Sequence, residues 1–245
     1  GFVEEGNWDL PTGALFIKHF DYDLTRGNPA TAKRLETRLL VKNDTGSYGV
    51  SYRWNETGTE AFLVDDGGED FDMNINISGT PTNVHWRIPS RSECLACHTA
   101  AGGHGLSFET RQLNRTGTLG GFTDNYLQLL ASAGYLSNPP AQVHNLPKFV
   151  VPTDNSQTLE TRARSWLAVN CSYCHQAGGT GIGVFDMRPE LSLMQSGMID
   201  GHVGNVQQAH HKALVRGDHT ASVIWSRLAA DGGYTRMPPL ATAVV

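Results

Sequence analysis

The first 89 residues contain short segments in which apolar and polar positions alternate, separated by turns rich in Gly, Asp and Asn. Alternation with a period of two is typical of strands that bury one face. The stretch 43–46, Asn-Asp-Thr-Gly, predicts a turn between two such strands. We therefore expect a small antiparallel β module over residues 1–89. Its predicted strands are 35–41, 48–54, 59–64, 72–77 and 83–88.

From Pro89 onward the spacing of apolar positions becomes typical of helices. Ser90 and Glu93 have the Ser-x-x-Glu spacing of a capping box, which predicts a helix that begins just before the first cysteine. Further helices are predicted over residues 125–131, 158–170 and 222–230. The pattern thus predicts a β-rich start followed by a mostly helical remainder.

Composition and charge narrow the class of protein. The chain has 245 residues, a formal net charge of −5 and no run of Lys or Arg. Because nucleic-acid-binding surfaces are usually basic, this balance argues against a nucleic-acid partner. A membrane-spanning helix needs an apolar stretch of about 18 residues or more. The sequence contains none of that length, so no transmembrane segment is expected. Residues 1–5 lack the features of a signal peptide, as expected for a mature, processed protein or a fragment.

All four cysteines lie in two Cys-x-x-Cys-His strings. Two thiols separated by two residues can bond to the two vinyl groups of one porphyrin, and the histidine that follows can ligate the iron. The motif therefore predicts two covalently attached haems c, with the two motif histidines as iron ligands. The strings are Cys94-Leu95-Ala96-Cys97-His98 and Cys171-Ser172-Tyr173-Cys174-His175.

Two other interpretations use the same cysteines. A Cys-x-x-Cys pair can act as a redox dithiol, and two pairs can hold one zinc ion. Neither requires a histidine directly after each pair, so haem is favoured. Haem c is attached outside the cytoplasm, and the chain is therefore expected to be periplasmic or extracellular.

With the motifs placed, the expected fold class is α+β. A small antiparallel β module over residues 1–89 is followed by two mostly α-helical cytochrome c-like haem lobes, over 90–152 and 153–245. The second lobe is expected to be truncated at its C-terminus, because a lobe of this kind usually closes with one more helix.

An electron-transfer haem usually has a second axial ligand, Met or His, on the opposite face of the iron. For the second haem Met237 is the favoured candidate, because it lies in a proline-braced loop 62 residues after His175. The alternatives are Met187, Met194 and Met198. Each of these methionines could instead be a core residue that fills space without binding iron.

The first haem has no methionine nearby, since none lies between His98 and Cys171. Of the two histidines in that stretch, His144 is favoured over His104, which is only six residues from His98. An open or water-bound iron is another alternative and would indicate a catalytic haem. Candidates from elsewhere are Met73, His85, a histidine of the second lobe, or a residue of another subunit.

Several strings resemble a family of secreted bacterial diheme c-type cytochromes with an N-terminal β module. Members of that family often occur beside, or fused to, domains like the quinone-dependent sugar dehydrogenases. The resemblance covers nearly the whole chain and implies electron transfer outside the cell membrane. Its Met-Pro-Pro ending also favours Met237 as a ligand. Besides the two motifs, the matching strings are WDLPTG at 8–13, ETRLL at 36–40, YRWNE at 52–56, WRIPSR at 86–91, TRQLN at 110–114, RAR at 162–164 and MPPL at 237–240.

The expected function is that of an electron carrier rather than an enzyme. The protein would take single electrons from a donor, such as a periplasmic or extracellular dehydrogenase, and pass them to an acceptor protein. One alternative is a diheme peroxidase-type enzyme, although the spacing of 77 residues between the motifs is short for that class. Another is a subunit of an extracellular electron-conducting cytochrome polymer. The oligomeric state is left open.

Overall fold

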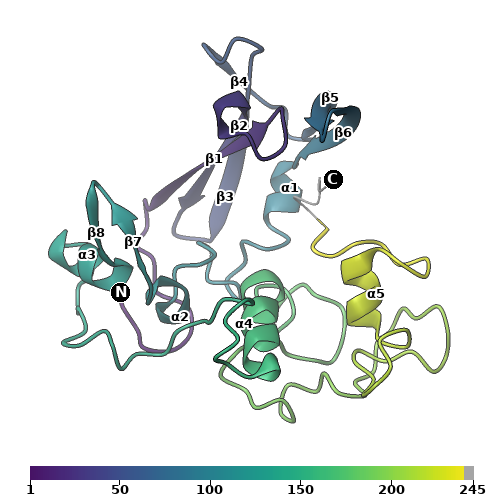
Figure 1. Ribbon diagram of the computed structural model, residues 1–245. Helices are drawn as coiled ribbons and strands as arrows, with labels where there is room; N and C mark the ends of the chain where they lie inside the picture. Colours follow the sequence, from purple (N-terminus) through teal and green to yellow (C-terminus); the bar gives the residue numbers. More distant parts are fainter. Residues whose placement is uncertain (240–245) are drawn as a thin grey trace. The chain divides into compact units, whose positions relative to one another are not determined.

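The computed structural model describes residues 1–239, which form two compact units (Figure 1). The loop unit comprises Gly1–Pro11 and Cys97–Arg236. The sheet unit comprises Thr12–Ala96 together with residues 237–239. The predicted ranges 1–89, 90–152 and 153–245 have other boundaries and stay a prediction; the end of the last range, residues 240–245, lies outside the described residues.

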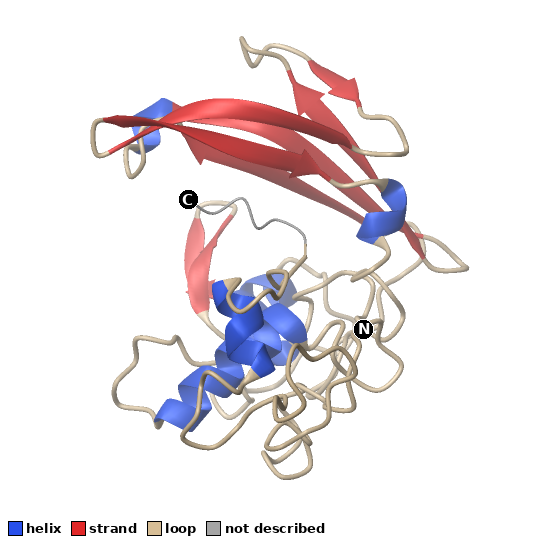
Figure 2. Cartoon of the chain, turned by 90° about the vertical axis from the view of Figure 1, so that its right-hand side faces the viewer, coloured by secondary structure: helices blue, strands red, loops and turns tan. Residues whose placement is uncertain are grey.

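The sheet unit contains long antiparallel strands that curve and twist together (Figure 2). Strands β1 to β4 follow one another in a four-stranded sheet, and β5 and β6 form a separate hairpin. The predicted turn is present, with the amide of Asn43 donating to the carbonyl of Gly46 at 2.9 Å. The strands are β1 Leu15–Asp23, β2 Ala32–Lys42, β3 Ser47–Trp54, β4 Ala61–Leu63, β5 Glu69–Ile77 and β6 Thr80–Ile88; a short 3-10 helix, η1, spans Pro29–Thr31.

The five strands predicted from alternation correspond to β2 through β6 and are confirmed. Strand β1 was not predicted, because its side chains are mostly exposed and its sequence carries no clear alternation. It forms through nine paired positions with β2, from Leu15 opposite Val41 to Asp23 opposite Ala32. Long-range pairing of this kind leaves no local signal in the sequence.

The core of the sheet unit is built around Trp86. Its ring meets Phe20 and Tyr22 edge to face, with centroids 6.1 and 5.9 Å away. Its indole N–H donates to Oε1 of Glu36 at 3.1 Å, and the Glu36 side chain is fully buried. Arg38 completes the arrangement, since its Nη2 donates to the same carboxylate at 2.5 Å. A buried carboxylate is tolerated here because it is both paired and hydrogen-bonded.

The loop unit contains one hairpin, four short helices and long loops. Two apolar clusters stabilise it, one around Leu167 and Phe185 and the other around Trp8 and Leu127. Its elements are α2 Thr110–Leu113, β7 Thr116–Leu119, β8 Phe122–Asn125, α3 Tyr126–Ser132, α4 Leu159–Cys171 and α5 Val223–Ala229; helix α1, Arg91–Cys94, belongs to the sheet unit. None of the helices within residues 1–239 has the length and apolarity needed to cross a bilayer.

The prediction of two mostly α-helical cytochrome c-like lobes is wrong. The described residues hold five short α-helices, of which the longest, α4, has 13 residues, while strands dominate the sheet unit. Residues 172–222 contain no helix. Glycines such as Gly178 and Gly197 take positive φ values there, 76° and 65°, which a helix interior does not accommodate. Apolar residues of this stretch, such as Phe185 and Met198, are buried from loops.

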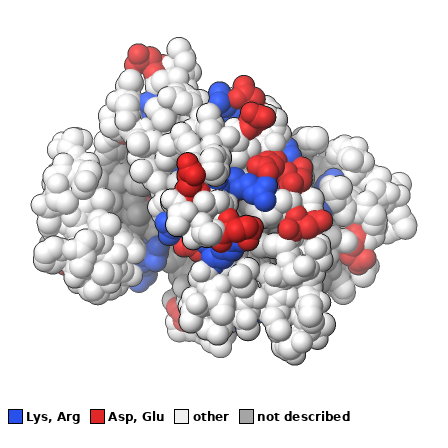
Figure 3. Space-filling view, turned by 90° about the horizontal axis from the view of Figure 1, so that it is seen from above, with Lys and Arg blue, Asp and Glu red and all other residues white. Residues whose placement is uncertain are grey.

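Acidic and basic side chains lie next to one another on the face presented in Figure 3. Ion pairs of the sheet unit are of this mixed kind, for example Arg87 with Asp70 at 2.7 Å and Arg34 with Asp21 at 2.8 Å. Both carboxylates are largely exposed, at 46% and 44%. Such exposed pairs contribute little to stability because water and salt screen them.

Two carboxylates paired with arginines of β2 offer a matched test of burial. We expect Glu36→Ala to lower the free energy of unfolding by about 2–4 kcal/mol, because it leaves Arg38 and the Trp86 N–H without their acceptor. Asp21→Ala, which removes the exposed partner of Arg34, should have a much smaller effect. Urea unfolding of both variants measures the difference. Equal effects would contradict the central role of Glu36.

Candidate functional site

The first motif begins at the end of helix α1. Ser90 and Glu93 form the predicted capping box, with Ser90 Oγ accepting from the Glu93 amide at 3.0 Å and the Glu93 carboxylate accepting from the Ser90 amide at 2.7 Å. The helix therefore starts at a defined residue and ends at Cys94. The sulfur of Cys94 lies against Gly49 of β3, where a Cβ would be only 3.0 Å from Sγ. Burial in this position raises the pKa of the Cys94 thiol.

The ring of His98 is oriented by the backbone of its own loop. Its Nδ1 lies 2.5 Å from the carbonyl oxygen of His104. Because a carbonyl only accepts, Nδ1 carries the proton, and Nε2 keeps the lone pair with which an imidazole binds a metal. The loop is fixed by the His104 amide, which donates to the Thr99 carbonyl at 2.9 Å, and by a positive φ of 59° at His104. His104 thus supports His98 through its carbonyl.

The second motif begins at the end of helix α4. Thr158 caps that helix, with its Oγ1 accepting from the Thr161 amide at 3.1 Å, and the helix ends at Cys171. The His175 ring stacks on Phe185, with centroids 5.0 Å apart and planes inclined by 17°. Burial lowers the pKa of His175, and nearby Arg227 adds to this effect. A neutral imidazole is the form that ligates a metal.

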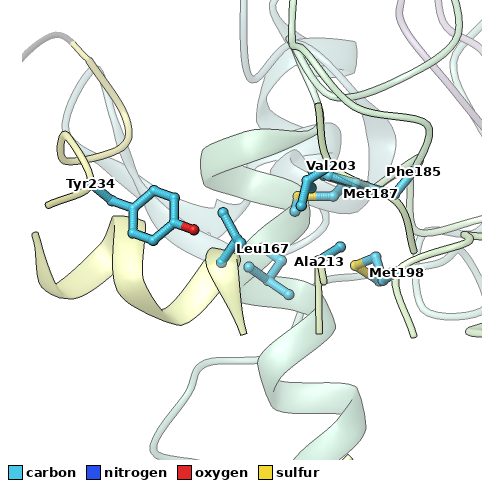
Figure 4. Packing of buried hydrophobic residues seen from close by; sticks show 8 residues of the cluster. Leu167, Phe185, Met187, Met198, Val203, Ala213 and Tyr234 are labelled. Atoms are coloured by element: carbon cyan, nitrogen blue, oxygen red, sulfur yellow. The ribbon is translucent and has the colours of Figure 1, made fainter. Parts of the chain in front are cut away.

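The buried apolar cluster shown in Figure 4 packs against Cys171 of the second motif. It includes Phe185, on which His175 stacks, and two of the methionines considered above, Met187 and Met198. The Met187 amide donates to the His175 carbonyl at 2.8 Å, which ties the cluster to the motif. Its buried members are Leu167, Phe185, Met187, Met198, Val203, Ala213, Val223 and Tyr234.

The loops of the two motifs pack directly against each other within the loop unit. The sulfurs of Cys97 and Cys174 lie 3.5 Å apart. This thiol contact lowers the pKa of Cys174, whereas burial raises the pKa of Cys171 to about 11. The side-chain amide of Gln176 donates through Nε2 to the carbonyl oxygen of Ala101 at 2.9 Å. Residues 77 positions apart in the sequence are therefore neighbours.

The predicted sixth ligands have varied surroundings. Met237 is half-buried in the sheet unit, whereas His175 belongs to the loop unit, so its ligation stays a prediction. Met194 is 91% exposed, and His144 is exposed in a turn. Met73 and His85 both contact other side chains of the sheet unit. Met73 packs against the core of the sheet unit, while His85 bonds Asp72 and Asp70 at 3.0 and 3.2 Å.

The cysteines do not converge on one point. Within the described part of the chain, no group of three or more His, Cys, Asp or Glu side chains is arranged to hold a metal ion. Each motif presents two thiols and one histidine, which is the donor set that covalent haem requires.

Comparison with protein-family models, with curated proteins and with solved structures finds no significant match. Functional inference therefore depends on the residues themselves.

Sequence reasoning did not single out Tyr173, Gln176 or Glu109. Tyr173 occupies a variable position of the second motif, yet it is buried, and burial raises its pKa to about 12. Glu109, which precedes α2, is only 9% exposed. Burial, reinforced by the charge of Glu190, raises the pKa of Glu109 to about 7. No local pattern distinguishes these residues, because their burial results from contacts between distant loops.

The raised pKa of Glu109 predicts a pH-dependent loss of stability. A carboxyl group whose pKa is higher in the folded state stabilises the fold below the unfolded value of 4.5, and this contribution is lost as the pH rises to about 7. The loss amounts to at most about 3 kcal/mol. We expect Glu109→Gln to remove it, so the variant should gain stability relative to the wild type at pH 8 but not at pH 4.5.

Urea unfolding at both pH values measures this difference. Glu160→Gln, at a glutamate on α4 whose side chain is 57% exposed, is the control and should show no such change. A Glu109→Gln variant with the same pH dependence as the wild type would contradict the assignment.

Proposed function

We propose that this chain is a diheme c-type cytochrome that carries single electrons outside the cytoplasm. The observation that carries the proposal is the orientation of His98, whose Nδ1–H donates to the His104 carbonyl and so fixes the tautomer with which imidazoles ligate metals. A redox dithiol would not need this arrangement. The same motif recurs at Cys171 to His175, where the half-buried imidazole stacks on Phe185 of an apolar cluster.

In this proposal Cys94 and Cys97 attach one haem c, and Cys171 and Cys174 attach the other. Once bound, each haem supplies reversible one-electron chemistry at its iron. The surrounding residues tune this chemistry. His98 is held by its hydrogen bond, and Phe185 keeps water from one face of the His175 ring. Met237 is the proposed sixth ligand of the second haem.

The proposed partners are redox proteins. The donor is a periplasmic or extracellular dehydrogenase, and the acceptor is a further electron carrier. Two arguments support this assignment: covalent haem is attached outside the cytoplasm, and the sequence resembles secreted diheme cytochromes associated with dehydrogenase-like domains.

Haem content is the direct test. When the chain is produced in a periplasm equipped for haem attachment, we expect two covalent haems per chain by mass spectrometry and by the pyridine haemochrome spectrum. The double variants Cys94→Ala/Cys97→Ala and Cys171→Ala/Cys174→Ala should each retain one. A mature chain without haem would overturn the proposal.

The Met237 assignment is tested separately. A thioether bound to ferric haem gives a weak absorption band near the red end of the spectrum. We expect Met237→Ala to abolish this band and Met194→Ala, which changes a methionine that is 91% exposed, to leave it unchanged. Persistence of the band in Met237→Ala would show that another residue is the ligand. A high-spin signal in electron paramagnetic resonance of the wild type would favour the peroxidase alternative.

A further inference from the structure

The contacts between the two motif loops join equivalent positions. Cys97 is the second cysteine of its motif and Cys174 is the second cysteine of the other, and their sulfurs are 3.5 Å apart. A second pair of equivalent positions, three residues after each motif histidine, is also in contact. There Ala101 lies beside Gly178, since a Cβ at Gly178 would be 3.9 Å from that of Ala101.

Contacts of a residue with its own counterpart are the signature of a twofold axis, as in isologous interfaces. Two such contacts, at Cys97 with Cys174 and at Ala101 with Gly178, indicate a twofold relation between the loops at these positions, although Gly178 has a positive φ of 76° that Ala101 does not share. The glycines five residues after each second cysteine also correspond. A Cβ at Gly102 or at Gly179 would collide with the carbonyl oxygen of Cys97 or Cys174 respectively, so each loop folds back on its second cysteine at the equivalent glycine.

Further contacts hold the loops together. The Gln176 amide donates to the Ala101 carbonyl at 2.9 Å. The buried Tyr173 reaches from the second motif to Ser107 after the first, with 3.5 Å between the hydroxyl oxygens. Gly102 approaches the Tyr173 carbonyl so closely that a Cβ would be 3.3 Å away. The two loops therefore form one packed structure rather than two independent sites.

We propose that the two haems form one pseudo-symmetric pair, joined at Cys97 and Cys174, in which electrons pass between the haems through this sulfur contact. The inference rests on the diheme function proposed above. On attachment each S–H adds across a vinyl C=C, so that sulfur bonds one carbon and hydrogen the other, and nothing is lost. Each sulfur then belongs to the edge of its own porphyrin. Because the two sulfurs are neighbours, the two porphyrin edges lie next to each other.

Circular dichroism in the Soret region tests the pair. Two closely spaced haems couple their transitions and give a bisignate band that neither haem produces alone. We expect this band in the wild type and its absence from the summed spectra of the two single-haem variants, Cys94→Ala/Cys97→Ala and Cys171→Ala/Cys174→Ala. If that sum reproduces the wild-type spectrum, the pair is refuted while the diheme function stands. If the wild type binds no haem, both proposals fail.

A second variant keeps both haems and weakens the contact between the loops. Gln176→Ala removes the bond from Gln176 to Ala101 and should reduce the amplitude of the bisignate band at unchanged haem content. Gln157→Ala, at an exposed glutamine before α4, is the matched control and should leave the amplitude at the wild-type value. An unchanged band in Gln176→Ala would contradict the role of this contact in holding the pair.

Discussion

The packing of one motif loop against the other is the constraint on which the loop unit depends. Each motif carries two thiols and a histidine, and the loop that follows its helix must also leave room for its counterpart. This double requirement explains why small residues gather there. Ala101, Gly102 and Gly178 all lie where a larger side chain would meet the opposite loop or its own backbone. The polar groups that this packing buries find partners across the contact, as the Gln176 amide does at the Ala101 carbonyl. The site is therefore a property of two segments together, although each segment carries its own motif.

Local features of the sequence predicted local structure well. Alternation identified β2 to β6, and the Ser-x-x-Glu spacing identified the start of α1, because both signals arise from residues near one another in the chain. The fold class was mispredicted for the complementary reason. After Cys171 a mostly helical lobe was expected from the haem motif, but Phe185 and Met198 are buried from glycine-rich loops, and the motif carries no signal for how the chain beyond it folds.

The candidate site shows the same division. The motif itself selected the cysteines and histidines of the candidate site. It could not predict that Cys97 meets Cys174, or that the His104 carbonyl orients His98, because neither contact follows from residue spacing. The burial of Glu109 is likewise a result of tertiary packing. The sixth ligand of the first haem is the hardest case, since the histidines and the methionine considered for it are exposed, engaged with other side chains, or, like His104, supporting His98.

The two motifs have the same donor residues but differ in surroundings, and in the proposed diheme protein this difference gives the electron a preferred position. A hydrogen bond from Nδ1–H, as His98 makes to His104, increases the electron-donating strength of the ring and stabilises the oxidised iron. At the second motif the His175 ring stacks on Phe185 beside a buried apolar cluster, and low polarity disfavours the additional positive charge of the oxidised state. The second haem should therefore have the higher potential. A first electron would reside there. The short path through Cys97 and Cys174 would carry it from the first haem to the second, and the first haem could then accept a second electron. Such a pair suits a donor enzyme that releases electrons two at a time, because both can be accepted within one complex.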